Sequence, residues 1–525
     1  MDGAMSVLAV GRLAPECIAR LEEDGLRVEA RLDADAADLE ACIDGHEALV
    51  VAPGVPVGAA VLDAARALKA VGVAGTGAGG IDVDAATRRG IVVVHAPDAG
   101  AVSEAEHALA LVLAVLRDLR TGDAALRGAA ADWMPGCGVE VRGTSLGLIG
   151  VRASSSLLVE RARALGMEVL ACEAQVGEAA AVGGAVDCVT PEQVMAQADV
   201  LVLQTAGTDA PLLGASVLPG LRPGARLVIP SAAGVVDAAA LAQALTDGRI
   251  AAAAVAVEPG DVPAPLLSAP RLLLTTPADA GTIDAARRAA VSVAEQVAAV
   301  LRGRLLRGAL NVPAAGDDAD ELMPFMGLCS QLGRLLVQLA GAPVDAVEIT
   351  YGGSVAYYDT RLLTAGVLGG VLAGRSEVPV NFVNAELVAS ELGVSASETR
   401  ESGIPDFPRL ITVAAGGTGG AMSVSGTSLG SQHKPRLVRV FGEDVDVAPA
   451  PHMAVLRYVD APGIGGKVGT LLGEWAVNIA HMSVGRGKLG DEAVMVVTLD
   501  DALTPQQTDE LVARCGLKYA RAVEL

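Results

Sequence analysis

The stretch at residues 145–173, SLGLIGVRASSSLLVERARALGMEVLACE, constrains the fold of this chain most. Its first apolar run ends at Gly150, apolar residues then recur at helical spacing, and a second apolar run ends in Glu173. A strand, a tight turn, a helix, a second strand and an acid in this order outline a dinucleotide-binding βαβ unit. Strands joined by a crossover helix lie parallel, so the sequence predicts a parallel sheet around this stretch.

The turn after the first of these strands departs from the dinucleotide-binding pattern Gly-x-Gly-x-x-Gly. Gly150 is the only one of the three glycines present, because Arg152 and Ser155 take the places of the second and the third. The second glycine lets a pyrophosphate approach the backbone, and the third lets the helix pack closely on the strand. The scaffold is therefore predicted, and the chemistry that it usually supports is called into question.

Two interpretations of the residues around this turn stay open. In the first, Ser154, Ser155 and Ser156 cap the helix, and we favour it. In the second, the same serines and Arg152 bind a phosphate or another anion at the helix N-terminus. Glu173 keeps the acid that binds a ribose hydroxyl, which would select NAD over NADP if the chain binds a dinucleotide.

The length and charge of the chain limit its organisation and its partners. A chain of 525 residues should hold several domains. The net charge of -23 would repel nucleic acid and anionic membranes, so we expect neither as a partner. The sequence contains no bilayer-spanning apolar run and no signal-peptide pattern, so we expect a cytoplasmic protein. Seven scattered cysteines without a C-x-x-C pair favour reduced thiols, and we expect no metal site.

The order of apolar runs and helical patterns divides the chain into four domains. Strands alternate with helices through residues 1–301, which predicts two doubly wound α/β domains of Rossmann type. The polar stretch AAGDDAD at residues 314–320 marks the clearest boundary. An α+β domain follows, and a βαββαβ pattern of ferredoxin-like type begins at residue 451. We therefore predict domains at residues 1–96 with 286–315, 97–285, 316–450 and 451–525.

The order of these pieces is similar to the long-form D-3-phosphoglycerate dehydrogenase family over essentially the whole chain. That family joins a D-2-hydroxyacid dehydrogenase core to an intervening domain and a C-terminal ACT domain. The segments that carry the resemblance are IDVDAATRRGIVVVHAP at residues 81–97, AEHALAL at 105–111, LRPGARLV at 221–228, VVDAAALAQAL at 235–245, FVNA at 382–385, YVDAPGIGGKVGTLL at 458–472 and VNI at 477–479. The resemblance implies a substrate-binding domain, an NAD-binding domain and two regulatory domains.

Members of this family use an arginine to hold the substrate carboxylate, a histidine to pass the proton and a glutamate to orient the histidine. By the resemblance, the arginine position is Ala232, the histidine position is Ala278, and Glu258 is the glutamate position that is retained. Alanine neither donates a proton nor binds a carboxylate through a guanidinium. General acid catalysis alone contributes about two to four orders of magnitude, so we expect normal catalysis to be lost or greatly weakened.

The substrate-phosphate side of the core is also altered by comparison with the family. Ala52 stands where the family has an arginine after the second core strand, and Gly100 stands where it has an asparagine after A-P. The loop at residues 75–80 is rich in glycine. His107 and His95 are the histidines that could replace the lost acid. We expect a structural role for His107, and we do not expect His95 to replace the lost acid.

The resemblance finds one site intact, in the ACT domain. In the family, serine binds at the interface of two ACT domains, and the matching positions here are Tyr458, Asp460 and Asn478. Asp460 would bind an amino group and Asn478 a carboxylate, so L-serine or another amino acid is the expected effector. The alternative is that these segments only define the ACT fold.

Arg400 and Arg409 of the intervening domain fall near basic residues that the family uses for an anion effector. A pair of arginines is more often part of the solvated surface, so this assignment is the weaker of the two effector hypotheses.

These observations leave two main hypotheses for the function. In the first, the chain is a pseudoenzyme related to the serine-biosynthesis dehydrogenases, which has lost NAD-dependent catalysis and keeps an amino-acid-binding ACT domain. In the second, it is a working or repurposed NAD-dependent 2-hydroxyacid dehydrogenase with relocated catalytic groups. A degraded gene product without a role is a third reading. The first two predict a homo-oligomer, a dimer or tetramer, through the apolar helix at residues 102–119 and the ACT domains, and the first also allows a mixed oligomer with an active paralogue.

Overall fold

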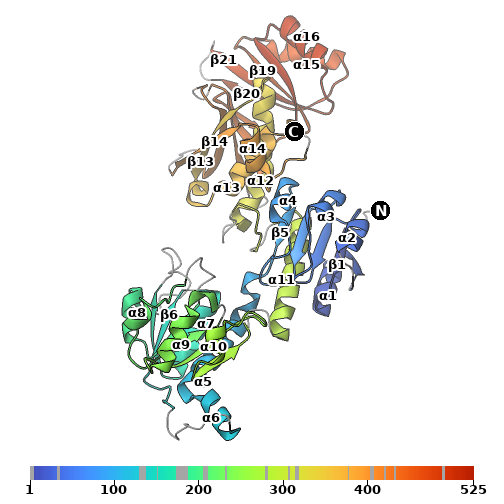
Figure 1. Ribbon diagram of the computed structural model, residues 1–525. Helices are drawn as coiled ribbons and strands as arrows, with labels where there is room; N and C mark the ends of the chain where they lie inside the picture. Colours follow the sequence, from blue (N-terminus) through green and yellow to red (C-terminus); the bar gives the residue numbers. More distant parts are fainter. Residues whose placement is uncertain are drawn as a thin grey trace.

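The computed structural model describes residues 5–31, 33, 36–128, 138–150, 152–172, 187–204, 211–230, 233–277, 282–304, 308–313, 319–376, 378–402, 407–418, 421–430, 433–486 and 491–525. Within these residues the strands form four sheets, one for each of four domains. Figure 1 shows the second domain at the bottom, the first in the middle, and the third and C-terminal domains at the top.

The first domain is built on a parallel sheet with the strand order β2-β1-β3-β4-β5. Short Val-, Leu- and Ala-rich runs form its inner strands, and they are buried, as expected of a parallel sheet covered by helices. Helix α11 (Ile283–Leu301) returns to this domain after the second one, and Val293 and Val297 of α11 pack into its core. The other elements are β1 (Ser6–Val10), α1 (Pro15–Glu23), β2 (Arg27–Arg31), α2 (Ala36–Cys42), β3 (Ala48–Val51), α3 (Ala59–Ala64), β4 (Ala70–Val73), α4 (Val83–Arg88) and β5 (Val92–Val94).

The second domain is a parallel sheet with the order β12-β11-β10-β9-β6-β7-β8. The direction of winding reverses at β6 (Ser145–Ile149), which has β9 on one side and β7 on the other. Doubly wound sheets bind ligands at such a reversal, so the turn after β6 lies where a ligand is expected. The other elements are α5 (Ala101–Arg117), α6 (Leu119–Leu126), α7 (Ala153–Ala164), β7 (Glu168–Cys172), β8 (Asp187–Cys188), α8 (Pro191–Gln197), β9 (Val200–Leu203), β10 (Ala225–Ile229), α9 (Ala238–Thr246), β11 (Ile250–Ala256), α10 (Ala264–Leu267) and β12 (Leu272–Thr275).

The segment Pro97–Arg117, which contains α5, is long and apolar enough to cross a membrane by length and composition. Half of its most apolar window is buried inside the protein, where Leu111, Val112 and Leu116 contribute to the core of the second domain. We therefore assign this segment to the core of the fold.

The third domain has a mixed sheet with the order β14-β13-β15-β16-β17-β18, in which β13 and β14 are parallel and the other pairs are antiparallel. Its helices α12 and α13 cover the face that carries Ile349, Ile411 and Val413. The elements are α12 (Ala319–Ala340), β13 (Ala346–Gly353), α13 (Arg361–Val371), α14 (Ala385–Glu391), β14 (Ser395–Glu401), β15 (Arg409–Ala415), β16 (Ser423–Leu429), β17 (Lys434–Val440) and β18 (Glu443–Val447).

The C-terminal domain has the order β19-α15-β20-β21-α16-β22 along the chain and an antiparallel sheet ordered β20-β21-β19-β22. This is the predicted ferredoxin-like topology, and with the two parallel sheets and the mixed sheet it confirms the predicted fold class. The elements are β19 (His452–Val459), α15 (Ile464–Glu474), β20 (Ile479–Arg486), β21 (Glu492–Leu499), α16 (Pro505–Cys515) and β22 (Tyr519–Glu524).

The third and C-terminal domains share one hydrophobic core. Met453, Val455 and Val496 of the C-terminal sheet lie in the same buried cluster as the apolar residues of α12. The Tyr519 hydroxyl donates to the Leu339 carbonyl at 2.6 Å, which ties β22 to the end of α12. The outer face of the C-terminal sheet is therefore covered within the chain.

The third domain also docks on the first through asparagine side chains. Asn381 donates through Nδ2 to the Gly90 carbonyl at 2.8 Å, and Asn384 donates to the Arg88 carbonyl at 3.2 Å. Both asparagines flank or belong to the FVNA segment, and Asn384 is fully buried. This segment thus joins two domains.

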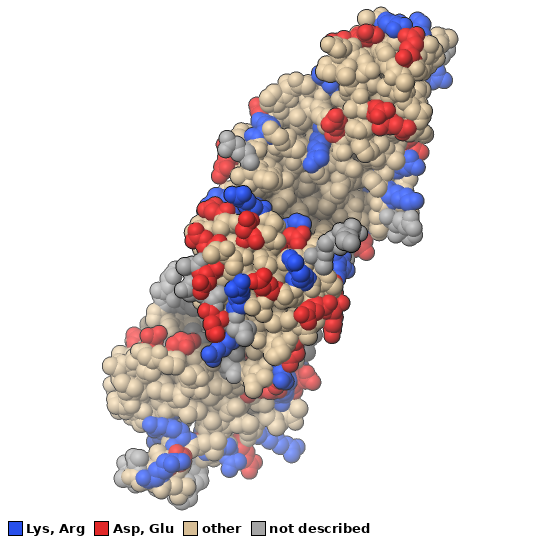
Figure 2. All heavy atoms as spheres, turned by 90° about the vertical axis from the view of Figure 1, so that its right-hand side faces the viewer, with Lys and Arg blue, Asp and Glu red and all other residues tan. Residues whose placement is uncertain are grey.

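Charged side chains are interspersed over the middle of the molecule on the face in Figure 2, where acidic and basic groups alternate. Such a mixture of both signs is typical of a solvated protein surface.

Candidate dinucleotide and effector sites

The turn after β6 begins as a dinucleotide-binding turn does. Gly150 has a φ of 86°, which L-residues with a side chain rarely adopt, and its N–H donates to the Cys172 carbonyl at 3.2 Å. The retained glycine therefore makes the sharp exit from the strand that the βαβ unit requires. Val151 lies outside the described residues, and α7 begins at Ala153.

Ser155, in the place of the third glycine, is fully buried and hydrogen-bonded on both sides. Its hydroxyl donates to Oε1 of Gln204 at 2.7 Å and accepts the N–H of Arg152 at 2.9 Å. The second bond caps the first turn of α7. The hydroxyl is thus engaged within the protein and has no free donor for a phosphate.

Ser154 is fully buried as well, and its hydroxyl links two other side chains. It donates to Oε2 of Glu104 at 2.9 Å and accepts from Nε2 of Gln204 at 3.3 Å. Ser156 is exposed and makes a long contact of 3.4 Å with the Ala153 carbonyl. The hydroxyls of Ser154 and Ser155 therefore point into the protein at the start of α7.

Arg152 stands beside the same cluster and forms an ion pair with Glu104 of α5, with 3.6 Å between Nη2 and Oε1. The Glu104 side chain is mostly buried, with 13% of its surface exposed, whereas Arg152 is 39% exposed. A carboxylate at this place offsets the positive charge that would attract an anion. We name Glu104, Arg152, Ser154, Ser155 and Gln204 the turn cluster.

Glu258 follows β11 and is exposed in a turn, in which the Asp261 N–H donates to the Glu258 carbonyl at 3.1 Å. The family positions at Ala232 and Ala278 and the ribose-binding position at Glu173 lie outside the described residues. Among the family's catalytic and cofactor positions, the structure thus places Gly150, Arg152, Ser155 and Glu258.

A small pocket of about 90 Å³ opens at the carboxyl ends of β1, β3 and β4 in the first domain. It is lined by Arg12, Leu13, Ala14, Pro53, Ala74, Gly75, Thr76 and alanines of α11. Arg12 brings a cationic side chain to this pocket. Sequence reasoning missed it, because a single arginine after a strand belongs to no motif. Ala52, at the position where the family resemblance implies a substrate-binding arginine, is buried.

The two candidate replacement histidines lie in different surroundings. His95 is held by a 2.9 Å contact between Nδ1 and the Thr76 carbonyl, next to the pocket. His107 lies on α5, where burial lowers the pKa of the imidazole below its usual value. Its Nε2 has no hydrogen-bond partner within the described residues. His107 is therefore a partly buried residue of α5 whose Nε2 is packed against the protein.

The expected effector residues of the C-terminal domain fall at two ends of one sheet. Tyr458 and Asp460 lie at the end of β19, whereas Asn478 precedes β20, at the level of the start of β19. The ends of an eight-residue strand are separated by roughly 24 Å. One chain therefore does not bring Asp460 and Asn478 together.

Asp460 and Asn478 each have a hydrogen-bond partner within the chain. Oδ2 of Asp460 accepts from Nη1 of Arg486 at 2.8 Å, and only 12% of the Asp460 side chain is exposed. Asn478 donates through Nδ2 to Asp500 at 2.7 Å. Burial, and then the nearby Asp460 carboxylate, raise the pKa of Tyr458.

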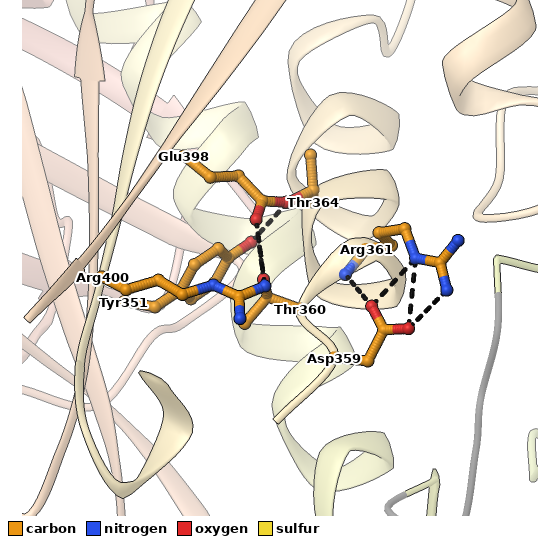
Figure 3. A network of polar contacts seen from close by, with 7 residues as sticks. All are labelled: Tyr351, Asp359, Thr360, Arg361, Thr364, Glu398 and Arg400. Atoms are coloured by element: carbon orange, nitrogen blue, oxygen red, sulfur yellow. Dashed lines mark hydrogen bonds and ion pairs between the residues drawn. The ribbon is translucent and has the colours of Figure 1, made fainter. Parts of the chain in front are cut away.

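Arg400 and Arg409 also pair with acids of the third domain. Figure 3 shows Arg400 of β14 beside Glu398, at 3.7 Å, and Nη2 of Arg400 donates to the Thr360 hydroxyl at 3.0 Å. Arg409 lies 3.4 Å from Glu321 and over the ring of Phe325. No group of metal-binding side chains occurs in the described part of the chain.

Residues 7–311 match the catalytic domain of the D-isomer specific 2-hydroxyacid dehydrogenases, and residues 321–441 match the D-3-phosphoglycerate dehydrogenase intervening domain. The first match spans more than half of the chain. The chain therefore belongs to the D-isomer specific 2-hydroxyacid dehydrogenase family.

Within that family, the chain is similar to D-3-phosphoglycerate dehydrogenases over nearly its whole length. It is 32% identical to the enzyme of Archaeoglobus fulgidus over 99% of this chain and 100% of that one. It is 34% identical to the enzyme of Mycobacterium tuberculosis over 99% of each chain.

Solved structures share the fold of the first two domains. The NAD-complexed D-isomer specific 2-hydroxyacid dehydrogenase of Lactobacillus delbrueckii ssp. bulgaricus covers 58% of this chain and all of its own, with 18% identity and a TM-score of 0.51. A 2-hydroxyacid dehydrogenase of Polaromonas covers 59% of this chain and all of its own, with 21% identity and the same TM-score of 0.51.

Proposed function

We propose that this chain is a relative of the D-3-phosphoglycerate dehydrogenases that no longer performs normal NAD-dependent catalysis and keeps an amino-acid-binding C-terminal domain. The observation that carries the proposal is the turn cluster. Its serine hydroxyls bond to Gln204 and Glu104, and its arginine pairs with Glu104. The two serine hydroxyls are therefore bonded within the chain, and the arginine is paired with an acid.

The residues at this turn do not fit NAD. A pyrophosphate needs to approach the backbone at the second glycine, where the chain carries the Arg152 side chain instead. Anions bind at helix N-termini through free N–H groups and positive potential. Here the mostly buried Glu104 carboxylate adds negative charge at that end of α7. We therefore derive no catalytic step through a dinucleotide.

The substitutions at the catalytic positions support the same conclusion. Alanine at 232 offers no guanidinium for a substrate carboxylate, and alanine at 278 offers no proton for an alkoxide. Glu258 would then have no histidine to orient, which agrees with its exposed place in a turn.

The amino-acid site is proposed at the interface of two C-terminal domains. The amino group of an effector would displace the Arg486 guanidinium from the Asp460 carboxylate or bind that carboxylate beside it, since both groups are cationic donors. Its carboxylate would meet Asn478 of a second copy, because one chain holds the two residues at opposite strand ends. L-serine is the first effector to test.

The partners that we propose follow from these sites. A homo-oligomer, dimer or tetramer, would bring two C-terminal domains together, and the apolar helix α5 would supply a second contact. A mixed oligomer with an active paralogue would let this chain regulate that enzyme. We propose a cytoplasmic protein that binds neither nucleic acid nor membranes, consistent with the net charge of -23.

The small pocket beside Arg12 favours the alternative hypothesis of a working or repurposed dehydrogenase. It lies at the carboxyl ends of parallel strands, where α/β domains bind ligands, and His95 is held beside it. This alternative requires a dinucleotide or another cleft ligand to bind, and the proposed function does not.

The proposed effector site is tested by calorimetric titration of the full chain with L-serine. Wild-type protein should bind L-serine, and Asp460→Ala should abolish binding because the amino group loses its carboxylate. Glu474→Ala, which removes an exposed acid from α15 of the same domain, is the matched control and should bind normally. Unchanged affinity in Asp460→Ala would refute the site.

A further inference from the structure

Strand β14 is a free edge of the six-stranded sheet of the third domain. All seven of its residues are exposed, and it pairs with β13 without a bulge. Open edges offer unpaired N–H and C=O groups to another strand, and proteins usually cover or interrupt them. β14 contains no bulge and no proline, and within the described residues no other strand pairs with its outer side.

The pairing with β13 determines which backbone groups face outward. The Ser395 N–H donates to the Asp345 carbonyl at 2.9 Å, so the odd-numbered residues of β14 turn their backbone groups toward β13. Ala396, Glu398 and Arg400 then turn theirs to the open edge, since the direction alternates along a strand.

The charges of β14 favour one register for pairing with a second copy of itself. If two β14 strands run antiparallel about a two-fold axis at Thr399, Glu398 of each copy lies opposite Arg400 of the other. These are the residues whose backbone groups face outward, so each pair exchanges both of its backbone hydrogen bonds. Axes at Glu398 or at Arg400 would instead place like charges opposite each other, which destabilises a sheet.

The two charged side chains are already held in place for such a pair. Figure 3 shows Glu398 accepting hydrogen bonds from Thr360 and Thr364 at the start of α13, with the Thr360 bond at 2.7 Å. Arg400 donates to the same Thr360 hydroxyl. Because their rotamers are fixed on the helix side of the sheet, pairing would order few additional groups.

Thr399 lies on the opposite face, in a row of hydroxyl-bearing residues across the sheet. It is in register with Thr350, which is in register with Thr412, and Thr412 bonds Ser425 at 2.8 Å. A Thr399–Thr399 contact at the two-fold axis would continue this row into the second copy, and Thr–Thr pairs are favourable in sheets.

We propose that β14 pairs antiparallel with β14 of a second copy, with the two-fold axis at Thr399, so that one sheet continues through both copies. The contact is isologous, since the same strand serves on both sides. A pair of seven-residue strands is smaller than the roughly 1,000 Å² of a stable interface. It therefore adds to a second contact between the copies.

Disulfide trapping in the full chain tests this register. At the axis, the two Thr399 residues form a non-hydrogen-bonded pair with Cα atoms about 4.5 Å apart, which is within disulfide range. Thr399→Cys under mild oxidation should give a dimer on a non-reducing gel, and a reductant should convert this dimer to monomers. Ser397→Cys is the matched control on the same face of the same exposed strand. It should stay monomeric on that gel, because the register places it opposite Glu401.

A charge reversal provides the second measurement. Arg400→Glu in the Thr399→Cys background places acid against acid, so crosslinking should fall several-fold, and circular dichroism should show an unchanged fold. Crosslinking of Ser397→Cys as efficient as that of Thr399→Cys would overturn the register. A folded Thr399→Cys variant that forms no dimer would overturn the pairing, whether the edge stays open or accepts a foreign strand.

Discussion

At the scale of single residues, the chain keeps the first glycine of the dinucleotide-binding pattern and carries Arg152 and Ser155 at the places of the other two. Gly150 still adopts the left-handed backbone that the turn requires. Arg152 and Ser155 then engage Glu104 of α5 and Gln204, which directly follows β9. A local change of residue is thus stabilised by partners far away in the sequence.

Opening the turn is the residue-scale prediction. Arg152→Gly and Ser155→Gly free the backbone approach and the helix–strand contact, and Glu104→Gln removes the carboxylate that Arg152 would leave unpaired, so the triple variant should bind NADH. It should show no turnover, because positions 232 and 278 remain alanine. Cofactor fluorescence measures binding, and Ser156→Gly on the exposed side of the same helical turn is the control. A triple variant that still binds no NADH would show that other groups close the site.

At the scale of elements, the docking of the third domain on the first depends on a glycine. Gly90 has a φ of 70°, and a Cβ built there would lie 2.5 Å from Nδ2 of Asn381. That amide accepts the Val383 N–H through Oδ1 and donates to the Gly90 carbonyl. Any side chain at this position must displace the asparagine that joins the two domains.

Gly90→Ala should therefore lower the thermal unfolding midpoint more than Gly45→Ala. Gly45 has a φ of 85° with open space around its added Cβ, so it shares only the backbone strain of about 1–2 kcal/mol. The difference between the two variants reports the contact with Asn381. Equal midpoints would mean that the asparagine moves away without loss.

The elements themselves could be predicted from the sequence to a large extent. Buried runs such as those of β1, β6 and β11 are apolar and short, and the helices between them force parallel pairing. The site could be predicted only in part. The partners of Arg152 and Asp460 are Glu104 and Arg486, and neither follows from a motif or a period, because tertiary packing alone brings them together.

At the scale of the whole molecule, the third domain and the C-terminal domain pack around one shared core. Val496 and Val497 are neighbouring and fully buried residues of β21. Val496 belongs to the core shared with the third domain, and Val497 belongs to the core beneath the C-terminal helices. Substitutions at these two residues can therefore test whether the two domains are coupled through the shared core.

Val496→Ala should increase hydrogen exchange in α12 of the third domain, since it opens a cavity in the shared core. Val497→Ala should increase exchange chiefly in α15 and α16. Mass spectrometry of the exchanged peptides separates the two patterns. If Val496→Ala leaves α12 as protected as Val497→Ala does, the shared core does not couple the domains.

The central claim is that the turn after β6 no longer accepts a dinucleotide. A titration of the purified wild-type chain with NADH, followed by the fluorescence of the cofactor, tests it most directly. A family member with the full Gly-x-Gly-x-x-Gly turn serves as the positive control. We predict no saturable binding by this chain, because the turn cluster is closed on itself. Saturable binding in the micromolar range would contradict the account and favour a working dehydrogenase with relocated catalytic groups.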